Sequence, residues 1–267
     1  MPGANTSLSP DQLSTPPASC DTIERVMKFF DRFLKGAGDK STEPVDAPMR
    51  KALVDLVFNG LRDKNNRIHV EDALSAAATI VGERCIDAAG DFPLRDHTLA
   101  PGSRAFSTKA NELICGDVSE ISQLPRDSIV GILRSRLDPA QFADTDFPSL
   151  PEVFKQYAAR IGNPADWGKV PLSIPQDNLP FIPPLRAGYE TRRGVDQIFE
   201  PIHEDKTRCL RIAVESLAEI LKMTASAIDH KMALMLSIET INGMAKTAPM
   251  TEKAMQQAQA NPAPKAG

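Results

Sequence analysis

The sequence predicts an all-α protein, a multi-helix bundle with a long proline-rich strap, and three observations carry this prediction. Apolar residues recur at spacings of three or four, most densely in residues 208–245. Other apolar residues make the remaining faces of the same segment apolar: Ile220, Leu234, Ile238 and Ile241. A helix that is apolar nearly all round is typical of a buried position, so this segment is expected at the centre of the fold. The third observation is the series of prolines in residues 163–185, which predicts an extended strap between helices.

Similar amphipathic patterns predict helices earlier in the chain. A capping-box pattern at Asp21 and Glu24 begins a helical stripe that ends near residue 36. A second helix begins at Pro48 and ends at a turn over residues 63–66. Residues 70–89 are rich in alanine, which permits close helix packing. Further helices are expected over residues 107–115, 125–137 and 149–161, with Ser107 as an N-cap and Ser149 in a capping box with Glu152.

Residues 163–185 form the strap, because six prolines exclude a long helix there. Their many apolar side chains, Trp167 among them, predict that the strap lies against the helices. A short helix is expected over residues 195–199, followed by two final helices that separate near residues 224–229. Asp229 is the expected N-cap of the last helix. The apolar stripes predict that four helical segments form the core, residues 70–89, 149–161, 206–222 and 230–245.

The remaining segments define the predicted domain organisation. Residues 1–20 and 248–267 are poor in large apolar groups and are expected to be disordered tails on either side of a single helical domain, residues 21–247. Periodicity is lost between residues 90 and 102, where proline and glycine indicate a polar connection. A short β-hairpin near residues 96–107 is one form that this connection could take.

Composition excludes several classes of function. The 31 basic residues against 35 acidic ones leave a net charge of −4, so no basic excess favours nucleic acid. No apolar run is long enough to span a membrane, and the N-terminus does not have the pattern of a secretory signal. Four widely spaced cysteines favour reduced thiols in a cytoplasmic protein.

The order of features from residue 70 onward resembles a bacterial all-helical family of unknown function. The resemblance rests on an alanine-rich helix ending in IVGERC (residues 80–85), NELICGD (residues 111–117), the strap, and the IDH triplet (residues 228–230) before a Met-rich helix. It implies the helical fold over about two thirds of the chain and no particular activity.

Candidate catalytic residues lie in the segment 91–117. Asp96 and His97 are adjacent, and Cys115 follows on the next predicted helix. A histidine oriented by a carboxylate beside a thiol is the minimum for general-base or nucleophilic catalysis. Against this, Cys115 falls on an apolar helical face, and the G-x-S-x-G nucleophile elbow does not occur.

Candidate ligand-binding residues are Arg186, Arg192 and Arg193, which accompany two glycines at the entry to the last helices. Arginines there could hold a phosphate or carboxylate. Acidic neighbours in the sequence make a solvated ion-pair surface the commoner arrangement. Glu200 and His203 have the Glu-x-x-His spacing of ferritin-like metal sites, but only one copy exists, so no metal site is expected.

These observations favour a non-catalytic helical protein that works through a protein partner or through self-association as a homodimer. The alternative is a small-molecule-binding protein or a hydrolase-type enzyme, with its site between residues 91–117 and residues 163–193. In neither case does the sequence call for a cofactor.

Overall fold

The computed structural model describes residues 46–90, 100–104, 107–118, 120–161 and 169–251. Within these ranges the α-helices are α2 (Asp46–Gly60), α3 (Val70–Ala89), α4 (Thr108–Cys115), α5 (Ile129–Arg136), α6 (Leu150–Ala159), α7 (Pro184–Phe199), α8 (Lys206–Thr224) and α9 (His230–Met244). The same ranges contain no β-strand, so the prediction of an all-α bundle is confirmed. The predicted helix that begins at Asp21 lies outside the described residues.

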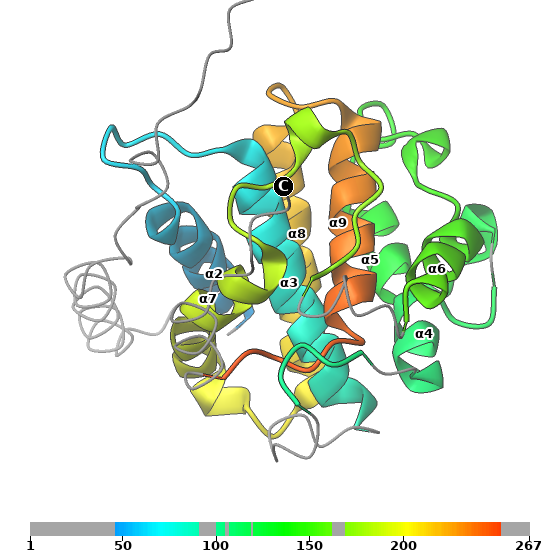
Figure 1. The fold of residues 1–267 in the computed structure, drawn as a ribbon, viewed down its shortest axis with the longest axis horizontal. Helices are drawn as coiled ribbons and strands as arrows, with labels where there is room; N and C mark the ends of the chain where they lie inside the picture. The colour runs from blue at the N-terminus through cyan, green and yellow to red at the C-terminus, as the bar shows by residue number, and fades with distance from the viewer. Residues whose placement is uncertain (1–45, 91–99, 105–106, 119, 162–168, 252–267) are drawn as a thin grey trace, which may run out of the picture. The chain divides into compact units, whose positions relative to one another are not determined.

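Helix α3 is the central element of the bundle. It packs against α8, α9 and α7, and Figure 1 shows it between α9 on one side and α2 with α7 on the other. Small side chains explain the close packing, because a Cβ atom added at Gly82 would lie 2.5 Å from the Cβ atom of Met244 on α9. None of the described helices is both long enough and apolar enough to cross a membrane.

The core contains side chains from all four segments that the sequence assigns to it, residues 70–89, 149–161, 206–222 and 230–245. Fully buried large side chains include Leu74, Leu150, Ile212, Leu217, Ile220, Leu221 and Leu234. Helices α2, α4, α5 and α7 add Leu53, Ile114, Leu133 and Phe199, which are also buried. The core prediction is therefore confirmed, and four further helices contribute to it.

Side-chain caps account for several helix ends. Ser107 and Asp229 each accept a hydrogen bond from the backbone amide three residues further on, as the sequence predicts. Ser128 caps α5 in the same way, so this helix is shorter than the predicted range of 125–137. Ser149 is the N-cap residue of α6, but its side chain makes no capping hydrogen bond.

The strap is shorter than predicted because α7 begins at Pro184. A proline in the first turn of a helix costs no hydrogen bond, and α7 then runs through the expected short helix at 195–199. Val170 and Ile174 of the strap are buried, whereas Leu179 and Phe181 are exposed. The second half still contacts α3, because the backbone N–H of Ile182 donates to Asp72 at 2.9 Å and Asn178 donates to Glu71 at 3.4 Å. The described part of the strap therefore lies against the helices, with its apolar side chains buried mainly in the first half. Trp167 lies outside the described residues.

Two other boundaries can be compared with the sequence. Half of the predicted hairpin at 96–107 lies outside the described residues. In the described half, Arg104 forms an isolated antiparallel bridge with Thr247. Ala248 and Met250 are buried, so packing continues past residue 248, where the C-terminal tail was expected to begin. The tail at 1–20 and residues 252–267 are outside the described part of the chain.

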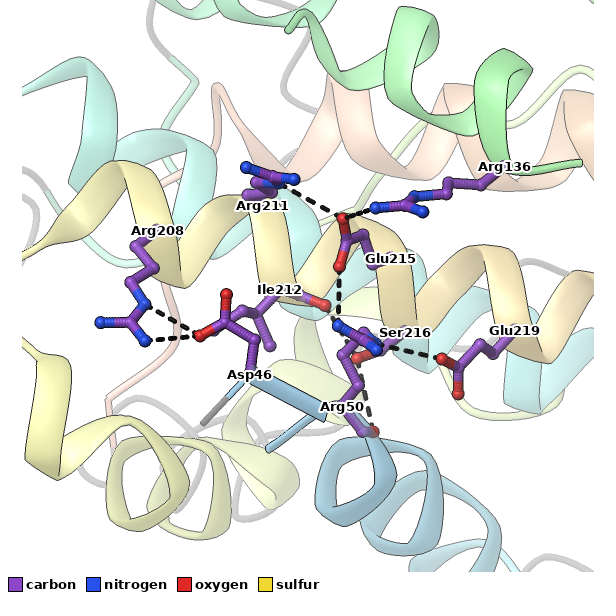
Figure 2. A network of polar contacts seen from close by, with 9 residues as sticks. All are labelled: Asp46, Arg50, Arg136, Arg208, Arg211, Ile212, Glu215, Ser216 and Glu219. Carbon is purple, nitrogen blue, oxygen red and sulfur yellow. Dashed lines mark hydrogen bonds and ion pairs between the residues drawn. The ribbon is translucent and has the colours of Figure 1, made fainter. Parts of the chain in front are cut away.

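A charged network joins α2, α5 and α8 (Figure 2). Its centre is Glu215 on α8, whose side chain is 6% exposed. Arg136 and Arg211 donate to one oxygen of this carboxylate, and Arg50 donates to the other at 3.0 Å. Burial alone would raise the pKa of Glu215, but the hydrogen bonds and charges of the arginines outweigh it and lower the pKa below its ordinary value.

The Glu215→Gln substitution should therefore destabilise the protein by about 1.5–3 kcal/mol at pH 7. Because the folded-state pKa lies below the ordinary value of 4.5, the carboxylate stabilises fully above that pH. Its contribution is lost as the pH falls through the folded-state pKa. Urea denaturation from pH 7 to pH 3 should show the variant and the wild type converging in acid.

Glu219→Gln on the same helix is the matched control, since the Glu219 side chain is 44% exposed and contacts only Arg50 among the described residues. Its effect should stay below about 1 kcal/mol. Equal losses in both variants would contradict the central role of Glu215.

Candidate functional site

Helix α6 contributes Val153, Gln156 and Tyr157, which lie three and four residues from Val153 and so share a side of the helix, and Arg160 follows as the C-cap residue. This face lines a pocket of about 340 Å³, together with residues 171–173 of the strap and part of α9. We call this hollow the α6–α9 pocket. It brings together segments that are far apart in the sequence.

Helix α9 contributes Glu239 and Asn242 to the pocket. They are three residues apart on α9 and therefore share a face of this mainly apolar helix. Both residues are buried, at 5% and 1% exposure. Polar groups buried in this way need partners, which the strap and the following residues of the chain supply.

The strap is fixed against α9 by a glycine and by two hydrogen bonds. A Cβ atom at Gly243 would lie 2.3 Å from a methyl group of Val170, so only glycine allows this approach. The backbone N–H of Ser173 donates to Glu239 Oε2 at 2.7 Å, and its hydroxyl donates to Oε1. These contacts hold the strap and α9 together as one wall of the pocket.

The end of α6 is fixed to the strap by Arg104. Its guanidinium donates to the carbonyl oxygens of Arg160 and Lys169, at 2.8 and 2.7 Å, and lies 5.5 Å from the ring centre of Tyr157. These bonds use the backbone of Arg160 and leave its exposed side chain available to a ligand. Within the described residues, the guanidinium of Arg160 forms no ion pair.

Lys246 is buried behind the pocket, at 3% exposure. Its ammonium donates to Asn242 Oδ1 and lies 4.5 Å from the ring centre of Phe154 and 5.5 Å from that of Tyr157. Burial lowers the pKa of Lys246 to about 8. Since the amide oxygen of Asn242 is used by Lys246, its NH₂ group is the part that a ligand could use.

The predicted catalytic residues are only partly described. Asp96 and His97 lie outside the described residues. Cys115 is buried at the end of α4, with its sulfur near the carbonyl oxygens of Asn111 and Gly116, and burial raises the pKa of its thiol. A neutral thiol is a poor nucleophile, so these surroundings favour a structural role for Cys115. The catalytic hypothesis stays a prediction.

The three predicted ligand-binding arginines all lie on α7 and do not line the α6–α9 pocket. Arg186 pairs with Glu190 at 2.7 Å, and Arg192 pairs with Glu83 at 2.8 Å. Arg193 is exposed, and the described residues give its side chain no partner. The first two are thus engaged in ion pairs, the commoner arrangement for such residues.

A second hollow of about 330 Å³ contains Glu200 and His203, with Arg84, Lys206 and Cys209. The Nδ1 atom of His203 lies 2.8 Å from the backbone oxygen of Glu200, and its Nε2 atom lies 2.7 Å from the carboxylate of Glu204. Among the described residues, no group of three or more histidine, cysteine or acidic side chains could hold a metal ion.

Comparison of the chain with protein-family models, curated proteins and solved structures finds no match. The resemblance to a bacterial helical family therefore stays a prediction. The residues of the pocket were not singled out from the sequence. The one available signal was the position of Glu239 and Asn242 on one face of a helix that is mainly apolar.

Proposed function

We propose that this protein binds a small organic molecule in the α6–α9 pocket. The observation that carries the proposal is a hollow of about 340 Å³ with a buried carboxylate in its wall. Ligand pockets measure roughly 300–1,000 Å³ and combine apolar surface with a few fixed polar groups. This proposal takes up the small-molecule alternative that the sequence left open. The site differs in one respect: it lies between the strap and helices α6 and α9, whereas the sequence placed it between the strap and residues 91–117.

The pocket has both kinds of surface that a small ligand needs. Val153, Leu172 and the ring of Tyr157 supply apolar contact area. Glu239 and Asn242 supply an acceptor and a donor at fixed positions, because both side chains are buried and hydrogen-bonded. A wall that is rigid before binding lowers the entropic cost of association.

Association with a protein partner, which the sequence favours, has less support from the described surface. The exposed large apolar side chains there are Ile161, Leu179, Phe181 and Met223. They come from the segment after α6, from the strap and from the end of α8. Being spread over three segments, they do not by themselves define the contiguous apolar patch that marks an interface.

Ligand-observed NMR with a fragment library tests the proposal. Fragments should bind the wild-type protein, and the Ala159→Phe variant should lose them, because Ala159 is an exposed residue that lines the pocket. Ala158→Phe is the matched control: Ala158 is also exposed on α6 but does not line the pocket. Binding should be unchanged in this control.

A library without hits, or hits that bind Ala159→Phe as well as they bind the wild type, would contradict the proposal. Thermal denaturation of both variants checks that each is folded. Equal melting temperatures for the two variants would show that any difference in binding arises at the pocket.

A further inference from the structure

The α6–α9 pocket is lined by two side chains of opposite charge that do not neutralise each other. Glu239 lies on α9, and Arg160 follows the last residue of α6. No ion pair joins them, and neither forms one with any other described residue. The pocket therefore presents one negative and one positive group that no other described charge neutralises.

The carboxylate of Glu239 has the stronger requirement for a partner. At 5% exposure it is held by the N–H and hydroxyl of Ser173, which are neutral donors. A buried charge without a counter-charge is unfavourable, and a cation that enters the pocket would offset this cost. A carboxylate oxygen has a further lone pair for such a donor after each hydrogen bond is made.

The guanidinium of Arg160 offers the complementary recognition. Its planar set of donors matches a carboxylate, which it can bind through two parallel hydrogen bonds. One guanidinium and one carboxylate in the lining therefore favour a ligand that carries an acidic group as well as an amine.

We propose that the ligand is a small zwitterion, such as a free amino acid, with its ammonium group facing Glu239 and its carboxylate facing Arg160. This inference rests on the proposed function of the pocket. Tyr157 also lines the pocket, and its ring supplies apolar contact area for the rest of the ligand.

Titration of the full chain with three series of probes tests the inference: free amino acids, their N-acetyl derivatives and their C-terminal amides. N-acetylation removes the positive charge, and amidation removes the negative one. In wild-type protein each change should weaken binding by about tenfold or more, because each leaves one charged group of the pocket unpaired. This comparison does not depend on any variant.

Two variants then test which side chain of the pocket binds which charged group of the ligand. Glu239→Gln should weaken the free amino acids and the amides by about tenfold or more and leave the N-acetyl derivatives unaffected. Arg160→Gln should weaken the free amino acids and the N-acetyl derivatives, and spare the amides. Arg193→Gln, on the exposed side of α7, removes the same charge as Arg160→Gln and should change nothing.

The outcomes separate the inference from the proposed function. Neutral fragments that bind the pocket more tightly than the free amino acids would overturn the inference and leave the proposed function standing. Amino acids that bind wild type and Glu239→Gln equally well would also overturn it. If neither fragments nor amino acids bind, both are overturned.

Discussion

Replacing Leu217 by alanine should lower the free energy of unfolding by roughly 2–5 kcal/mol. Leu217 is completely buried on α8, and this helix packs against α3, α2 and α5. Neighbours on several sides restrict collapse around the missing side chain, so the cost of a cavity adds to the lost burial of apolar surface. Urea denaturation should show a lower midpoint with an unchanged slope.

Met223→Ala on the same helix is the control, because Met223 is 61% exposed. Its effect should remain within about 0.5 kcal/mol. A Leu217→Ala protein with the midpoint of the wild type would contradict the position of α8 in the core.

Replacing Lys246 by methionine should stabilise the protein by roughly 1–3 kcal/mol at pH 7. The lowering of the pKa from 10.5 to about 8 corresponds to roughly 3 kcal/mol of unfavourable burial of the ammonium group. Methionine has a similar length and no charge. It loses the hydrogen bond to Asn242, which subtracts about 1 kcal/mol from the gain.

The effect has a defined pH dependence. Below pH 8 the lysine is charged in both states, so the folded wild type bears the full cost of burial. Between pH 8 and 10.5 the unfolded chain binds the proton more strongly than the folded one, so the wild type becomes more stable as the pH rises. The advantage of Lys246→Met should shrink over this range.

Thermal denaturation of both proteins at pH 7, 8, 9 and 10 measures this difference. Lys222→Met on α8 is the control, because Lys222 is exposed and its replacement should matter little at any of these values. A Lys246→Met protein that is less stable than the wild type at pH 7, or a gain that does not change with pH, would contradict the account of a buried ammonium.

The sequence predicted the helices whose signals are local. The separation of α8 from α9 followed from Asp229, whose side chain caps α9 by a hydrogen bond to an amide three residues away. The start of α7 was missed because Pro183 and Pro184 resemble a continued extended strap. A proline is compatible with either an extended segment or a first helical turn, and only the packing of the helix decides between them.

The pocket could not be predicted in the same way, because its charged groups are far apart in the sequence. The strap, α7 and α8 all lie between Arg160, which follows α6, and Glu239 on α9. Helical spacing predicts that Glu239 and Asn242 share a face, but it does not show that this face meets α6. Their contact with the strap depends on Gly243, whose missing side chain admits Val170, and on the bonds from Ser173.

A crystal structure of the protein with its tightest-binding fragment or amino acid tests the central claim most directly. The account predicts electron density for the ligand between α6 and α9, in contact with Glu239 and Asn242, with the strap where it lies without the ligand. Density for the ligand elsewhere on the molecule, with the α6–α9 pocket containing only water, would contradict it.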